Sequence, residues 1–198
     1  MSGKEVSPLI EGGKGIAVSN GQSCGAWAAA GGVGTFSGVN ADSYDEAGNI
    51  NPVLYQGRTR RDRHEELLAY AIKGGISQAR IAHEMAGGEG RIHMNVLWEM
   101  AGAERVLHGV LTGVRGLIHG VTCGAGMPYK IAQIAASYGV YYYPIISSAR
   151  AFRALWKRSY FKFKDFWNYL QRTRSWGMER NKTSHKINKY SKKYLFKE

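Results

Sequence analysis

The chain has 198 residues, of which 44% are apolar, and 27 Lys and Arg against 15 Asp and Glu give it a formal net charge of +12. This length suits one globular domain with a substantial core. The charge is uneven, because residues 1–150 hold 13 basic and 12 acidic side chains, whereas residues 151–198 hold 14 basic and 3 acidic ones. A body this close to neutral excludes a nucleic-acid-binding domain that works through its overall field.

The sequence also excludes several other classes of protein. No apolar stretch reaches the roughly 18–20 residues that a membrane-spanning helix needs, and the N-terminus has no apolar signal core. The two cysteines, Cys24 and Cys123, form neither a disulfide framework nor a zinc-binding pattern. We therefore expect a cytoplasmic protein that makes no contact with a membrane.

Short apolar runs and glycine-rich turns alternate along most of the chain. The expected strands cover residues 16–19, 33–36, 91–98, 117–122 and 140–146. The expected helices cover residues 24–30, 60–73, 76–86, 103–114 and 128–139, and a further helix opens at residues 147–148. Asn20 or Ser23 is expected to cap the first helix, and Gly74 and Gly75 are expected to separate the second helix from the third.

Five alternations of strand and helix without a hairpin signal predict an α/β fold with a parallel sheet. The pattern leaves an open sheet and a barrel as alternatives. In either case ligands bind at the carboxyl ends of the strands. The polar or small residues expected at those ends are Ser19, Thr35, Phe36, Asn95, Thr122, Cys123, Gly124 and Ser147.

Asn95 interrupts an apolar strand, and a buried amide needs hydrogen-bond partners because leaving it unpaired costs roughly 1–3 kcal/mol. Its donors and acceptor suit a heterocycle such as flavin, while a bond to a neighbouring loop is the alternative. Gly12, Gly13 and Gly15 would let a flat ligand or a phosphate approach the backbone, although tight turns use glycine for other reasons too.

The remaining reactive side chains give no catalytic or metal pattern. No histidine stands at a strand end beside a partner, and Cys123 has no assignable histidine, so we interpret both types as structural. The basic and aromatic residues beyond 165 have the chemistry to bind phosphates and bases but no recognisable module. We interpret residues 165–198 as a disordered or weakly helical basic tail that does not bind nucleic acid specifically.

Several blocks of residues together resemble the nitronate monooxygenases, formerly called 2-nitropropane dioxygenases. The blocks are residues 12–15 (Gly-Gly-Lys-Gly), 28–34 (Ala-Ala-Ala-Gly-Gly-Val-Gly), 93–96 (His-Met-Asn-Val), 122–128 (Thr-Cys-Gly-Ala-Gly-Met-Pro) and 144–150 (Pro-Ile-Ile-Ser-Ser-Ala-Arg). The resemblance covers roughly residues 8–164. The order and spacing of the blocks make it fairly specific, whereas the block at 28–34 alone recurs across flavin barrels.

The resemblance implies a TIM-type barrel that binds FMN and oxidises alkyl nitronates with O₂. Carried over by position, Gly12, Gly13 and Lys14 match a loop after the first strand that lies against the flavin ring. Asn95 matches a third-strand amide that hydrogen-bonds the flavin, and Ser147 matches a further flavin-facing position. Apart from Lys14, the residues that carry these roles are among the strand-end positions and glycines singled out above.

Two features of the family do not occur in this sequence. The family has a Gly-Gly-His segment with the catalytic base, and later glycine loops that hold the FMN phosphate, but the only glycine after Gly139 is Gly177. We therefore expect residues 1–164 to be about five βα units of a partial barrel and residues 165–198 to be a tail unlike the family, arising from a frameshift or gene decay. On this hypothesis the catalytic residues are unknown, FMN binding is weak or lost, and activity is low.

Two other functions stay open at this point. The chain could be a non-catalytic remnant whose basic tail contacts RNA or acidic partners, or another FMN barrel enzyme such as an enoyl-reductase relative. A half barrel also leaves sheet edges uncovered, so we expect association that covers those edges.

Overall fold

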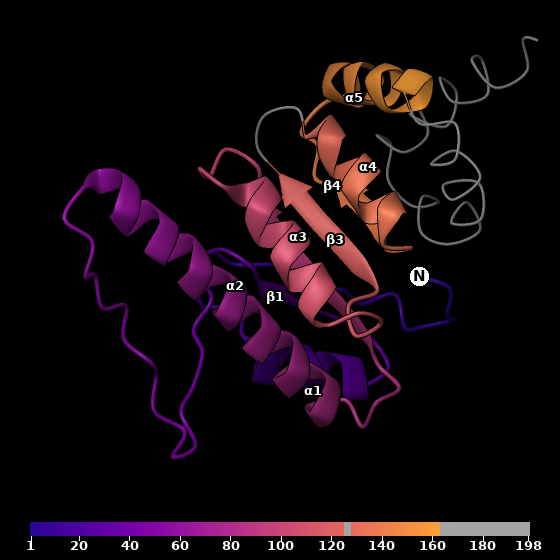
Figure 1. Ribbon diagram of the computed structural model, residues 1–198. Coiled ribbons are helices and arrows are strands. Elements are labelled where there is room, and N and C mark those ends of the chain that lie inside the picture. Colours follow the sequence, from indigo (N-terminus) through magenta and orange to yellow (C-terminus); the bar gives the residue numbers. More distant parts are fainter. Residues whose placement is uncertain (125–127, 163–198) are drawn as a thin grey trace, which may run out of the picture.

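The computed structural model describes residues 1–124 and 128–162 (Figure 1). Helices and strands alternate along them as α1 (Gly21–Ala29), β1 (Val33–Ser37), α2 (Arg60–Met85), β2 (Arg91–Leu97), α3 (Ala103–Gly113), β3 (Gly120–Gly124), α4 (Tyr129–Ser137), β4 (Tyr141–Pro144) and α5 (Ala149–Lys162). The four strands form one sheet in which every pair is parallel. The predicted α/β fold is therefore confirmed.

The strands lie in the order β1-β2-β3-β4, which is also their order in the chain. Crossovers between parallel strands are right-handed, so a strand order that never reverses places the connecting helices on one face of the sheet. Figure 1 shows α2, α3 and α4 following one another across the same side. An open doubly wound sheet would reverse its order and carry helices on both faces. The described residues are thus arranged like part of a (β/α) barrel.

The prediction that the first strand covers residues 16–19 is wrong. Residues 16–19 form a turn, and Ile16 and Val18 are 64% and 65% exposed, so no burial holds this run extended. The chain pairs with β1 further upstream instead, where Ile10 forms a parallel bridge with Val33. The Val33 amide donates to the Leu9 carbonyl and the Glu11 amide donates to the Val33 carbonyl, both at 2.9 Å.

The expected break at Gly74 and Gly75 is also wrong, because α2 runs through both glycines. Both are buried contact points: a Cβ on Gly74 would collide with the backbone of Ala41, and one on Gly75 would collide with the side chain of Val110. These glycines therefore let α2 pack closely against the loop after β1 and against α3. By contrast, the expected cap is confirmed, since the Asn20 side chain accepts a hydrogen bond from the Ser23 amide at 2.9 Å.

The two faces of the sheet differ in chemistry. On the helix-covered face, Phe36, Met94, Val121 and Tyr142 are register neighbours on the four strands, and all are buried in the core. The opposite face carries polar side chains and is crossed by the N-terminal segment, which contacts it through Ser2. We call this opposite side the inner face, since it corresponds to the interior of a barrel.

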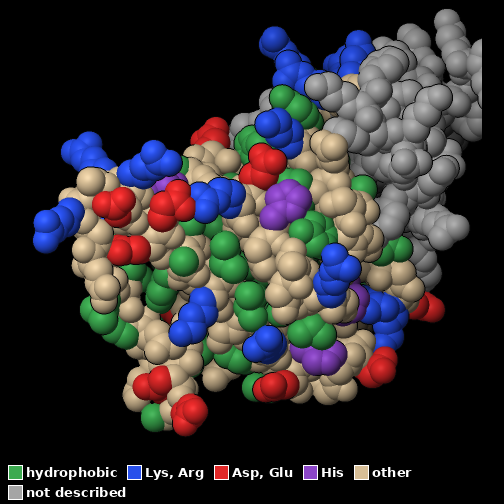
Figure 2. Space-filling model, in the orientation of Figure 1, with side chains coloured by type: hydrophobic (Ala, Val, Ile, Leu, Met, Phe, Trp, Pro, Cys, Tyr) green, Lys and Arg blue, Asp and Glu red, His purple; other side chains and the backbone are tan. Residues whose placement is uncertain are grey.

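The surface over the helices carries Lys and Arg side chains interspersed with Asp and Glu (Figure 2), as expected for a body near neutrality. In the described part of the chain, no helix combines the length and the apolar character needed to cross a membrane. The predictions for the basic tail at 165–198 and for residues 125–127 fall outside the described residues.

Candidate functional site

The segment Leu9–Glu11 pairs with β1 in the place of a first strand, and we call it the first strand position. The loop of Gly12, Gly13 and Lys14 follows this segment and so lies at its carboxyl end. The buried Ser19 hydroxyl closes this loop, because it donates to the Gly12 carbonyl at 3.2 Å and accepts from the Lys14 amide at 3.1 Å. Ser19 thus has a structural part in the loop. Gly12 and Lys14 are exposed, and Gly13 is half-buried.

The backbone of Gly13 lies directly against the side chain of Asn95 at the end of β2. A Cβ built on Gly13 would lie 2.6 Å from Asn95 Cγ and collide with it. Only glycine fits at this position without a shift of one of the two segments. The structure therefore brings together two of the residues that the sequence proposes for a flavin ring, although they are 82 positions apart.

Asn95 is held by β1 and β3. Its backbone carbonyl accepts from the Gly38 amide at 2.8 Å, and its Oδ1 accepts from the Thr122 hydroxyl at 3.1 Å. Asn95 and Thr122 are register partners, so their side chains project from the same face. Asn95 is half-buried, and within residues 1–124 and 128–162 its amide nitrogen, which lies beside Gly13, forms no hydrogen bond and is left as a donor.

Ser147 follows β4 at the same end of the sheet and is exposed. No hydrogen bond within the described residues joins it to Asn95 or to the loop at 12–14. The next residue, Ser148, starts α5 by accepting from the Ala151 amide at 3.1 Å. The structure therefore places Ser147 at the correct end of the sheet but does not bring it into contact with Gly13 and Asn95.

Exposed apolar side chains occur in the segments that end or follow the strands at this end of the sheet. Ile16 and Val18 belong to the loop after the first strand position, Leu97 ends β2, and Ile145 follows β4. Their exposed fractions lie between 41% and 65%. Apolar surfaces, an approachable glycine backbone and one amide donor are the elements of a site for a flat ring that accepts hydrogen bonds.

Glu11 belongs to this region, and the sequence did not single it out. Its carboxylate is buried and accepts from the Thr35 amide at 3.1 Å and from the Ser23 hydroxyl at 2.9 Å. It thereby ties the first strand position to β1 and to the first turn of α1. The available signal was an acidic residue between the apolar pair Leu9-Ile10 and the glycine loop.

The cysteine and the histidines of the sheet are not suited to proton transfer or nucleophilic attack. Burial raises the pKa of the Cys123 thiol to about 11, so the thiol stays protonated near neutral pH. Burial lowers the pKa of His93 to about 3 and that of His119 to about 4, so both rings stay neutral. Thr35 and Phe36 are fully buried inside the sheet. In the part of the chain that the structure describes, no group of His, Cys, Asp and Glu could hold a metal ion.

The residues present fit the ring of FMN, the cofactor that the resemblance implies. The fit rests on the contact of Gly13 with Asn95, which places the loop at 12–14 beside the Asn95 amide at the carboxyl ends of the strands. Among the described residues, the site offers binding groups and no catalytic base.

No family model matches the chain, and no curated protein matches it. Among solved structures, FabK from Thermotoga maritima is similar with 16% identity and a TM-score of 0.48, over 76% of this chain and 37% of that one. A point mutant of the same FabK is similar with 17% identity and a TM-score of 0.47, over 76% of this chain and 40% of that one. The chain thus spans well under half the length of these structures, and none of the comparisons identifies it as a nitronate monooxygenase.

Proposed function

We propose that the carboxyl ends of the strands bind the flat ring of FMN and that the chain serves an oxidoreductase that oxidises alkyl nitronates with O₂. The observation that carries the proposal is the contact of Gly13 with Asn95, whose amide nitrogen is left as a donor. When bound, FMN would supply the electron transfer and the reaction with O₂. The chain's own residues would orient the ring: the loop at 12–14 against one side, and the Asn95 amide at an acceptor atom.

The first experiment measures FMN binding by the purified full chain, from the flavin's visible absorption and from quenching of its fluorescence. Gly13→Ala places a methyl group in the Asn95 side chain, so we expect FMN affinity to fall by about tenfold or more, or about 1.4 kcal/mol. Gly15→Ala is the matched control, because a Cβ at Gly15 meets nothing within 4 Å. Equal affinity for the two variants, or no FMN binding by the unmodified chain, would contradict the proposal.

A second experiment separates the reactions. The FMN-loaded chain is mixed with an alkyl nitronate and O₂ consumption is recorded, and the same protein is then tested for reduction of an enoyl substrate. We expect O₂ consumption that depends on the nitronate but is slow, because the described site offers no catalytic base. Enoyl reduction without nitronate oxidation would favour an enoyl-reductase relative. A colourless protein that binds RNA in a salt-sensitive way would favour the non-catalytic alternative.

A further inference from the structure

The inner face of the sheet carries a buried polar pair away from the candidate flavin site. Thr35 on β1 and His93 on β2 are register partners, and neither side chain is exposed to solvent. The next position across the sheet is Gly120 on β3, where a Cβ would collide with the His93 ring. The imidazole therefore occupies the space that Gly120 leaves open.

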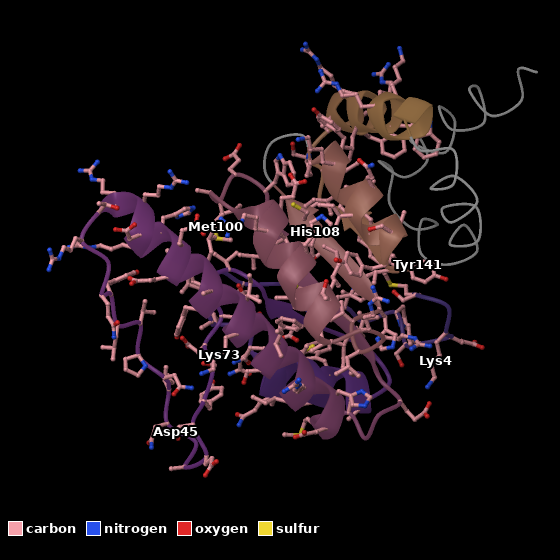
Figure 3. All side chains as sticks on the ribbon, in the orientation of Figure 1. Lys4, Asp45, Lys73, Met100, His108 and Tyr141 are labelled. Carbon is pink, nitrogen blue, oxygen red and sulfur yellow. The ribbon has the colours of Figure 1, made fainter. Side chains whose placement is uncertain are left out.

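One nitrogen of His93 is well satisfied. The Ser2 hydroxyl lies 2.8 Å from His93 Nε2 and 3.0 Å from the Tyr143 hydroxyl, and the Ser2 amide donates to the same Tyr143 oxygen at 3.1 Å. The rings of His93 and Tyr143 are stacked with centroids 4.8 Å apart. This chain of contacts fixes the N-terminal residues on the inner face. Figure 3 shows Lys4 and Tyr141 near each other, where the N-terminal segment passes the sheet.

At the other end of this chain of contacts, two buried polar atoms are not hydrogen-bonded to any described residue. His93 Nδ1 and Thr35 Oγ1 are both buried, and neither has a hydrogen-bond partner within residues 1–124 and 128–162. Because burial keeps the ring of His93 neutral, Nδ1 must either donate a proton or accept one. Two unsatisfied polar atoms on paired residues of neighbouring strands are an exception to the rule that buried polar groups are bonded.

We propose that one buried water molecule bridges His93 Nδ1 and Thr35 Oγ1. It completes a hydrogen-bonded chain that runs from Tyr143 through Ser2 and His93 to Thr35. Thr35 and His93 are register partners on neighbouring strands, and their side chains do not bond each other directly. Buried water typically takes hydrogen bonds from groups that would otherwise be unsatisfied, and each of these two atoms is such a group.

If the water molecule is present, removal of the Thr35 hydroxyl should lower the melting temperature of the full chain. Thr35→Val removes the hydroxyl and keeps the shape of the side chain, and we expect Tm to fall by about 2–4 °C because the water loses a partner. Thr35→Ser keeps the hydroxyl and is the control, with the smaller fall. If the hydroxyl is instead unpaired, its removal relieves an unsatisfied buried group, so an unchanged or raised Tm for Thr35→Val overturns the proposal.

A second measurement does not depend on how the variant folds. Two-dimensional NMR of the unmodified chain would show whether a long-lived water molecule transfers magnetisation to the His93 ring. A high-resolution crystal structure would show its density between the two side chains. A direct bond between Thr35 and His93, or a dry space between them, overturns the proposal even if Thr35→Val lowers Tm.

Discussion

The helix-covered face and the inner face of the sheet are built from alternate residues of the same four strands, yet they differ in chemistry. Met94 lies in the core of the helix-covered face, whereas its neighbours His93 and Asn95 project from the inner face. The helix-covered face holds the apolar core, whereas the candidate ligand contacts lie where the inner face reaches the carboxyl ends of the strands.

Loss of packing on the helix-covered face should have the largest effect. Phe36 is fully buried among the core side chains. We expect Phe36→Ala to lower the free energy of unfolding by about 3–5 kcal/mol, because it leaves a cavity that the helices cannot fill. Urea unfolding followed by circular dichroism measures this. A loss as small as that for Asn95→Ala would mean that the two faces contribute equally.

Low pH should reduce the free energy of unfolding, because His93 is buried on the inner face as a neutral ring. Burial lowers the pKa of His93 to about 3 in the folded chain, while in the unfolded chain the ring accepts a proton below about pH 6.5. Stability from the neutral ring is therefore present above about pH 6.5 and is lost as the pH falls toward 3, by roughly 1.4 kcal/mol per pH unit.

The control for this prediction is His93→Gln, which has no titrating ring. His119 also has a lowered pKa, of about 4, so only the difference between the two proteins reports on His93. Urea unfolding at about pH 7 and about pH 5 should show a steeper loss for the unmodified chain. Parallel losses in the two proteins would show that His93 is already protonated in the fold.

A smaller effect is expected where the inner face meets the candidate site. The Thr122 hydroxyl donates to Asn95 Oδ1 and so turns the amide nitrogen toward Gly13. Thr122→Val should weaken FMN binding by about 0.5–1.5 kcal/mol, and Thr122→Ser should restore it. The NMR signal of the Asn95 side-chain amide should move in Thr122→Val and stay in Thr122→Ser. An unmoved signal in both would show that Thr122 does not orient the amide.

The existence of β1 to β4 could be predicted from the sequence, and burial on the helix-covered face supports all four. The bounds of β3 were predicted less well, because the expected strand at 117–122 starts three residues before the observed Gly120–Gly124. The first strand position could not be predicted. Residues 16–19 have the same local pattern as a buried strand, but pairing with β1 is a long-range choice that selected Leu9–Glu11 instead. Gly74 and Gly75 misled for a related reason, since their function in packing α2 is visible only once Ala41 and Val110 are in place.

The candidate site was predictable in part for the same reasons. Asn95 stood out because an amide inside an apolar strand is unusual, and strand topology explains why it lies at the end where ligands bind. Its contact with Gly13 and the burial of Glu11 depend on how the first loop folds back, which no local pattern encodes. Ser147 shares the same end of the sheet, but no contact in the described residues ties it to Asn95.

The smallest expected effect concerns the outer edge of the first strand position. Leu9 and Ile10 are 58% and 47% exposed, and the groups that bond β1 belong to Leu9 and Glu11, so the backbone of Ile10 faces away from the sheet. An apolar edge that none of the described strands covers favours addition of another strand. We propose that a second copy of the chain pairs there, so light scattering should show a mass that rises with concentration. Ile10→Lys should keep the chain monomeric without unfolding it, because an edge lysine opposes strand addition. Leu54→Lys, in the exposed loop before α2, is the control and should leave the association unchanged. A mass that is independent of concentration, or equal behaviour of the two variants, would show that the edge recruits no second copy.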